Sequence, residues 1–412
     1  MLRKAITWLA VCSFALASCA TQQTSTNVGP EFSSTVADKS QQAAEVAAAQ
    51  YQGPKLDIVV PVFDPGLPED VNDYEDEGIW PELRRAEANR FAVKLREALE
   101  RTGAFGAVRV TPDTTATGDL YVVGRIDESN GEEVAISIQV SDISGELWYE
   151  ERYDHEVSEQ FHKDIRNKGL DPYQPVFDEA AEELVEELED YDFAELEQLQ
   201  SLAEIRFAAN FSEEAFAEYL KVDGDEITLT SLPSDADPML QRIRAVRIRD
   251  QLFVDGLQTH YEEFNVKMEE SYALWQEQSL QEVKAQREAE YEAMGKAILG
   301  VLAFGLAIAA AAAGANTGSA GTSAAANTGA IIAGVGGVAL IADSFQTSKE
   351  AEFHKDTLEE LGQSINLEMG PQVVEFDETT EEITGDAAEQ FAQWRAFLKR
   401  MYDAERTPAK KL

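Results

Sequence analysis

Apolar positions follow two different spacings in the first half of the chain. Residues 56–63 form a β-rich run, and an apolar stripe at three- and four-residue steps then marks a helix over 80–101. Four more β-rich runs follow, at 107–110, 119–126, 133–140 and 147–157. Helical spacing returns over 176–188. The pattern predicts the order β-α-β-β-β-β-α for residues 54–190, and the strict alternation within 133–140 is typical of a sheet with one buried face.

Helical spacing dominates the second half of the chain. Residues 191–250 are predicted to be helical with one break, an acidic turn followed by a short extended piece. Residues 245–294 contain no proline and repeat apolar positions every three or four residues, which predicts a helix on the order of 70 Å long. The last part, 367–412, has the pattern of a short extended piece and a helix. The fold class predicted is therefore α+β, a small α/β domain followed by a mostly helical region.

The long predicted helix runs into an apolar segment of unusual composition. Residues 297–315 are uncharged and rich in Ala, a polar turn occupies 316–328, and a second apolar run covers 329–342. This symmetry predicts a long helical hairpin over 251–366 with an apolar tip at 297–342. Small residues that recur at every fourth position on the two arms are Ala303, Ala307, Ala311, Gly329, Ala333 and Gly337. Such spacing lets helix backbones approach closely, and the segment resembles the glycine-zipper hairpins of some outer-membrane lipoproteins.

The apolar tip has two interpretations. In the first, it enters a bilayer or joins copies of the chain in a ring. Residues 297–315 would reach about 28 Å as a helix, which is close to one hydrocarbon thickness, whereas 329–342 is short for a span. In the second interpretation, the tip is a close-packed Ala/Gly helix pair buried in protein or a soluble coiled-coil tip. The sequence leaves both open.

The N-terminal segment has the organisation of an export signal. Arg3 and Lys4 precede an uncharged apolar run over 5–17, which is too short to span a bilayer. The run closes with Leu-Ala-Ser-Cys ending at Cys19, which resembles the lipobox of bacterial lipoproteins. The resemblance implies that Cys19 receives a diacylglyceryl group and becomes the N-terminus once residues 1–18 are removed. The alternative is an ordinary secretion signal in which the cysteine is fortuitous.

The residues after Cys19 indicate where a lipid would hold the protein. In many enteric-type lipoproteins, a residue other than Asp at the next position, here Ala20, favours transfer to the outer membrane. Residues 19–53 are rich in Gln, Ser, Thr and Ala, which is typical of a flexible tether. Because Cys12 lies in the leader, lipidation of Cys19 would leave no thiol for a disulfide, a metal or a nucleophile. We therefore expect a lipid anchor in the outer membrane, with the protein facing the periplasm.

The predicted α/β domain also resembles a known group. Its first helix closes with Thr-Gly-Ala-Phe at 102–105, and a later strand reads Gly-Asp-Leu-Tyr-Val-Val-Gly-Arg-Ile over 118–126. This pair resembles the small α/β domain of envelope lipoproteins related to the curli secretion lipoprotein and to the N-terminal domain of the Tol-system propeller protein. The resemblance covers about 55–190. The remaining sequence contains neither a propeller nor an obvious pair of pore-forming β-hairpins, so pore function does not carry over.

The charge balance excludes one class of partner. The chain has 77 Asp and Glu against 34 Lys and Arg, a formal net charge of −43. Nucleic-acid binding requires a basic surface, so we expect none. A strongly negative surface is also repelled by anionic lipid, which disfavours a protein that lies flat on a membrane.

The sequence offers no organised chemistry. Its histidines, none at metal-ligand spacing, are His155, His162, His260 and His354. The acidic run 70–77 is similar to a calcium loop, but Tyr74 stands where an Asp or Asn ligand belongs and Glu75 where Gly is needed. No phosphate loop or serine elbow is present. We therefore expect no enzymatic activity, no cofactor and no metal.

These features together predict a non-enzymatic, lipid-anchored envelope protein with a structural, assembly or protein-interaction role. The hairpin would insert into a membrane or join copies as a homo-oligomer, and an envelope protein is the other expected partner. The alternative is an oligomeric component of an outer-membrane export channel or transport complex. The expected division is a signal peptide at 1–18, a tether at 19–53, the α/β domain at 54–190, a helical linker at 191–250, the hairpin at 251–366 and a C-terminal piece at 367–412.

Overall fold

The part of the chain that the computed structural model describes comprises residues 51–76, 78–312, 349–376 and 379–406. The protein is a mixed α+β structure, and its α/β domain has the predicted order of elements. The expected signal peptide and Cys19 lie outside the described residues, as does all but the end of the expected tether.

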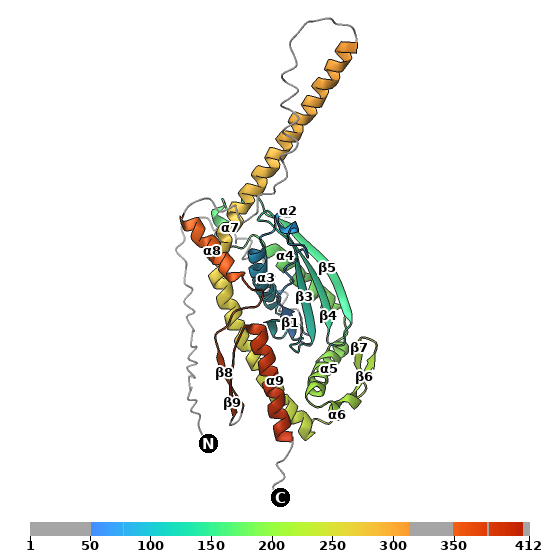
Figure 1. Cartoon of the computed structure of the whole chain (residues 1–412). Helices are drawn as coiled ribbons and strands as arrows, with labels where there is room; N and C mark the ends of the chain where they lie inside the picture. The colour runs from blue at the N-terminus through green and yellow to red at the C-terminus, as the bar shows by residue number, and fades with distance from the viewer. Residues whose placement is uncertain (1–50, 77, 313–348, 377–378, 407–412) are drawn as a thin grey trace, which may run out of the picture.

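The α/β domain is organised around a five-stranded sheet in the order β2-β1-β3-β4-β5 (Figure 1). β1 is parallel to β2 and β3, whereas β3, β4 and β5 form an antiparallel meander. The strands are β1 (Ile58–Pro61), β2 (Val108–Thr111), β3 (Leu120–Ser129), β4 (Glu133–Asp142) and β5 (Leu147–Glu156). A parallel pair needs a crossover connection, and α3 (Pro81–Thr102) joins β1 to β2. A single turn, α2 (Asp73–Asp76), precedes α3.

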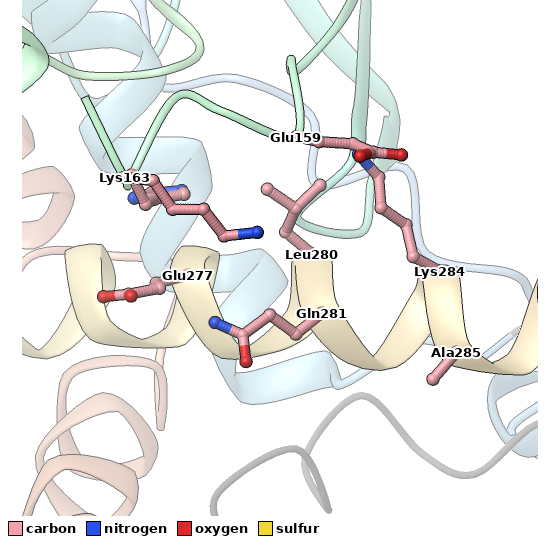
Figure 2. Close-up of a pocket in the computed structure, with 8 residues that line it drawn as sticks. Glu159, Lys163, Glu277, Leu280, Gln281, Lys284 and Ala285 are labelled. Atoms are coloured by element: carbon pink, nitrogen blue, oxygen red, sulfur yellow. The ribbon is translucent and has the colours of Figure 1, made fainter.

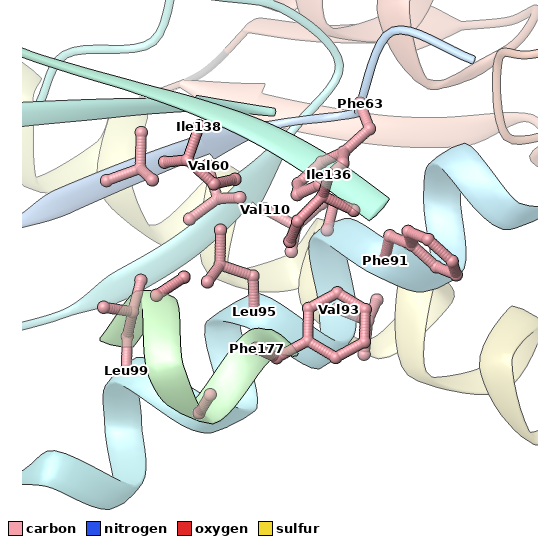
Figure 3. Packing of buried hydrophobic residues seen from close by; sticks show 14 of the residues in the cluster. Val60, Phe63, Phe91, Val93, Leu95, Leu99, Val110, Ile136, Ile138 and Phe177 are labelled. Carbon is pink, nitrogen blue, oxygen red and sulfur yellow. The ribbon is translucent and has the colours of Figure 1, made fainter. Parts of the chain in front are cut away.

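Two helices cover one face of this sheet, α3 and α4 (Gln174–Glu189) (Figure 3). Proline stands at the start of α3, where its missing N–H costs nothing, and Gly103 ends the helix in the left-handed conformation at φ 64°. Val60 and Ile136 from the sheet pack against Leu95 of α3 and Phe177 of α4, all of them buried. Ser137, Gln139 and Ser141 on the other face of β4 are more exposed, which confirms the alternation predicted for this strand. The sheet as a whole is not one-sided, because β1 is buried on both faces.

A second core joins the helical region to the sheet. It is formed mainly by α5 (Phe193–Phe211), the first part of α7 (Pro238–Ala312) and α9 (Ala387–Arg406). Phe253 of α7 stacks on Trp394 of α9, with ring centroids 5.0 Å apart. The other elements are α6 (Glu213–Phe216), α8 (Lys349–Leu361), the 3₁₀ turns η1 (Ile165–Asn167) and η2 (Ala217–Tyr219), and two hairpins, β6 (Leu220–Asp223) with β7 (Glu226–Leu229) and β8 (Gln372–Phe376) with β9 (Thr379–Ile383).

The helix α7 is the dominant feature of the molecule. It is longer at both ends than the helix predicted at 245–294, and at 75 residues it measures about 110 Å. Ala-rich sequence has the highest helix propensity, which accounts for its continuation through residues 297–312. Figure 1 shows α7 running along the globular body and then continuing beyond it as a single helix.

The two ends of the sheet define a direction along α7. β1 and β3 both start at the end that we call the base, where Asp57 and Asp119 lie, and the β3–β4 turn at Gly131 marks the opposite end, the top. β3 is ten residues long, so about 30 Å of strand separates the two ends. The described chain enters at the base side, where Tyr51 packs edge-on against Phe193. The extension of α7 leaves the body at the top (Figure 1).

Candidate functional site

The small residues predicted to mediate helix packing are only partly described. Ala303, Ala307 and Ala311 lie on the part of α7 that extends beyond the body. Gly329, Ala333 and Gly337, which belong to the second arm of the predicted tip, fall outside the described residues. The return arm α8 packs beside α7 within the body, where the Ser271 hydroxyl and His354 Nδ1 are 3.0 Å apart.

The side chain of Gln258 attaches α7 to the edge of the sheet. Its Oε1 accepts the backbone N–H of Val110 at 2.9 Å, and its Nε2 donates to the carbonyl of the same residue at 2.8 Å. Beside it, Arg109 of β2 donates to Asp255 of α7 at 2.6 Å. An exposed strand edge leaves backbone groups unpaired. The amide of Gln258 supplies those partners and holds α7 along β2.

A buried arginine forms the second attachment of α7. Arg90 of α3, 1% exposed, donates from Nη1 to Asn265 and Glu269 of α7, both at 2.7 Å. Its Nη2 donates to Asp171 at 2.7 Å, and its guanidinium lies 4.7 Å from the centroid of the Tyr272 ring. We call these five residues the Arg90 cluster. The cluster joins α7 to α3 and to the loop that precedes α4.

Both buried charges of the Arg90 cluster are ionised. Burial alone would lower the pKa of Arg90, but the charges of Asp171 and Glu269 raise it above its ordinary value. Burial alone would raise the pKa of Asp171, but Arg90 and the backbone N–H of Tyr173 hold it below its ordinary value. Each charge therefore depends on the other, because either one left alone in this site would carry an uncompensated desolvation cost.

A second buried carboxyl group lies next to the cluster. Glu87 of α3 is 0% exposed, and its Oε1 accepts hydrogen bonds from the hydroxyls of Ser129 at 2.5 Å and Tyr272 at 2.8 Å. Burial raises the pKa of Glu87, and the nearby charge of Arg84 opposes that rise. These contacts extend the polar attachment of α7 to the end of β3.

The third attachment lies at the top. Glu132, 1% exposed, follows the β3–β4 turn and pairs with Lys284 and Arg287 of α7. Gly131 in the same turn is so close to α7 that an added Cβ would lie 2.5 Å from Cβ of Ser279. We call the Gln258 contact, the Arg90 cluster and the Glu132 pairs the helix clamp. The clamp fixes α7 on the body from Gln258 to Arg287, and 25 further residues, about 38 Å, follow to Ala312.

One cavity lies between α7 and the loop at 158–163 (Figure 2). Its volume is about 230 Å³, and its charged lining residues include Glu159, Lys163 and Lys284. Lys284 reaches toward Glu159, with a closest approach of 3.9 Å, and also pairs with Glu132. The cavity is smaller than most ligand sites. We attribute it to the packing of the clamp.

A larger pocket opens at the base, and we call it the Asp119 pocket. Its volume is about 390 Å³, and it is lined by Asp57, Asp119, Gln200, Arg244, Arg247, Ile248 and Gln251. The parallel pairing of β1 and β3 brings the two aspartates together. Asp119 Oδ2 accepts the backbone N–H of Asp57 at 2.8 Å, and the carbonyl of Asp57 accepts the N–H of Asp119 at 2.8 Å. α5 and α7 supply the remaining residues of the pocket wall.

Asp119 is buried without full compensation of its charge. It is 3% exposed, and its Oδ1 has no hydrogen-bond partner among the described residues. Burial raises the pKa of Asp119 to about 6, and the neighbouring Asp57 adds to the rise, whereas the hydrogen bond from the Asp57 N–H and the charge of Arg247 oppose it. The Nε of Arg247 is likewise buried and has no partner in the described part of the chain.

Asp119→Asn should stabilise the protein near neutral pH. In the unfolded chain Asp119 ionises near pH 3.8 and in the folded protein at about pH 6, so the folded state loses stability as pH rises between these values. Above pH 6 the asparagine variant should be more stable by about 1–3 kcal/mol, and near pH 4 the gain should vanish. Urea unfolding at pH 4 and pH 7 measures the difference. An equal effect at both pH values would contradict the assignment.

No group of three or more potential metal ligands occurs among the described residues. In the same part of the chain, no helix has both the length and the apolar character needed to cross a bilayer. Comparison with family models, curated proteins and solved structures finds no match to this chain.

Sequence reasoning missed the two polar sites. Asp119 was part of the strand motif at 118–126, but no role was assigned to it. The available signal was an aspartate directly before each of two strands, Asp57 and Asp119. Only the parallel pairing of β1 with β3 makes them neighbours. The Arg90 cluster carries no comparable signal, because Arg90, Asp171 and Glu269 belong to three separate segments that only the tertiary fold brings together.

Proposed function

We propose that this chain is a non-enzymatic, lipid-anchored protein of the outer membrane that faces the periplasm and holds a rigid helical arm away from its anchored end. In this proposal Cys19 carries the lipid, and the tether leads to the base of the body. The arm is the part of α7 beyond Arg287 together with the predicted tip at 297–342. The tip inserts into a bilayer or joins copies of the chain.

The observation that carries the proposal is the course of α7. The helix starts near the base, is held by buried charges and hydrogen bonds along the body, and continues past the top without interruption. The chain enters the body near Phe193, on the base side. The described chain therefore begins at the end of the body opposite to the one from which α7 extends, which is the arrangement that a spacer between two attachment points requires. The acidic composition keeps the body itself off an anionic lipid surface.

Extraction of membranes with high salt and alkaline buffer tests this proposal. We compare the full chain with Cys19→Ala, with a deletion of 297–342 and with both changes together. If the tip inserts, each single variant stays with the membrane and only the double variant is released. If the tip joins copies, Cys19→Ala is released as an oligomer that becomes a monomer when 297–342 is deleted.

A matched variant separates these two outcomes further. The triple change Ala303→Leu, Ala307→Leu and Ala311→Leu keeps the segment apolar and helical but blocks close approach of helix backbones. Membrane retention should survive this change, whereas self-association through the small residues should be lost. Release of Cys19→Ala as a monomer, with no effect of the deletion, would contradict the proposed role of the arm.

A further inference from the structure

The Asp119 pocket contains charges that are already paired and charges that are not. Arg244 donates to both carboxylate oxygens of Glu204, at 2.6 and 2.9 Å, and to Asp235 at 3.0 Å. Asp57 accepts the backbone N–H of Ala107 at 2.9 Å and lies 3.6 Å from Arg109. Neither of these two lining residues therefore needs a further partner.

The remaining two charged lining residues, Asp119 and Arg247, carry opposite charges. Asp119 Oδ1 is an acceptor and Arg247 Nε a donor, and both are buried and without hydrogen-bond partners among the described residues. Both residues line the pocket and their charges interact, but no direct ion pair between them is present in the part of the chain described. Buried polar groups are ordinarily satisfied, so an unpaired acceptor and an unpaired donor on two residues that line one pocket point to a ligand that pairs with both residues.

The other lining residues indicate which apolar group and which net charge the ligand has. Ile248 lines the pocket and is 57% exposed, so its side chain is available to cover an apolar side chain of a ligand. The two charged lining residues that are not already paired, Asp119 and Arg247, balance one another, while the whole chain carries a formal net charge of −43 that repels free anions.

We propose that the Asp119 pocket binds a free aliphatic α-amino acid, with the ligand ammonium beside the Asp119 carboxylate, the ligand carboxylate beside the Arg247 guanidinium and the side chain covering Ile248. Such a zwitterion offers a donor and an acceptor on adjacent atoms and has no net charge. The volume of about 390 Å³ lies within the range of small-molecule sites. The inference is independent of the lipid anchor and the arm.

Titration calorimetry of the full-length chain at pH 7.5 tests the proposal, with leucine as the first probe and valine and alanine beside it. We expect leucine to bind with a Kd of about 1 mM or below. Isoamylamine, which lacks the carboxylate, and 4-methylpentanoate, which lacks the ammonium, should each bind at least about tenfold more weakly.

Two substitutions and one control assign the binding to this pocket. Asp119→Asn and Arg247→Gln should each weaken leucine binding at least about tenfold, and Asp119→Asn should do so while the protein remains folded. Asp164→Asn, which removes a partly exposed carboxylate far from the lining of this pocket in sequence, should leave the affinity unchanged. The proposal is overturned if none of the three amino acids binds with a Kd of about 1 mM or below, if either single-charge analogue binds as well as leucine, or if neither pocket variant weakens binding.

Discussion

Replacing Arg90 with Leu should lower the free energy of unfolding by about 3–5 kcal/mol, because it leaves Asp171 buried without its countercharge. The side chain of Asp171 is only 6% exposed, and Arg90 is its sole ion-pair partner among the described residues. Denaturant unfolding measures the loss. Amide hydrogen exchange along α7 near Asn265 should increase in parallel, since the clamp fixes that part of the helix.

Two further variants make this result specific to the buried pair. Glu269→Gln removes a partner of Arg90 that is 50% exposed, and it should cost less than about 1 kcal/mol. The double variant Arg90→Leu with Asp171→Leu should be more stable than Arg90→Leu alone, because no charge is then left uncompensated. If Arg90→Leu cost no more than Glu269→Gln, the cluster would not be what holds α7 to α3.

Gly131→Ala should destabilise the protein by about 3 kcal/mol, more than an ordinary glycine substitution in a turn. Gly131 has a φ of +89°, which disfavours any residue with a Cβ, and the new Cβ would lie 2.9 Å from the backbone nitrogen of Leu280 on α7. The β3–β4 turn would have to move away from α7. Denaturant unfolding gives the magnitude.

Gly169→Ala is the matched control for this prediction. Gly169 has a similar φ of +82°, but no heavy atom of the described residues lies within 4 Å of the position of its Cβ. The control should therefore show only the conformational cost, about 1 kcal/mol. The difference in stability loss between the two variants measures the contact between the turn and α7. Equal losses of stability would show that the turn does not contact the helix closely.

Periodicity predicted most of the α/β domain because its elements bury one face each. The alternation of Val134, Ile136 and Ile138 indicated a strand with a single buried face, and the structure confirms it. The apolar stripe through Phe91 and Leu95 likewise identified α3 within one residue at each end. The helix predicted at 245–294 and the Ala-rich helical arm predicted from residue 297 are one continuous helix in the structure, which begins seven residues before the predicted start, at Pro238. The Ala-rich stretch has high helix propensity but no amphipathic period, so the sequence left open what it packs against.

The tertiary contacts could not be predicted from the sequence. Nothing local shows that Gln258 pairs with the backbone of Val110, or that Arg90 meets Asp171 and Glu269, because these partners come from separate elements. The Asp119 pocket likewise arises only when the base of the sheet meets α5 and α7. The polar sites of this protein are products of how α7 is placed, and α7 is also the element that the proposed function depends on.

The distance between the body and the arm tests the central claim most directly. Removal of the leader together with Cys19→Ala leaves a chain without cysteine, so spin labels can be placed at Val266→Cys, an exposed position on the clamped part of α7, and at Leu306→Cys on the extension. A continuous helix places these positions about 60 Å apart. Pulsed electron–electron double resonance should give one narrow distribution of label-to-label distances near that value. A broad distribution at shorter distances would show that α7 does not project as a rigid arm.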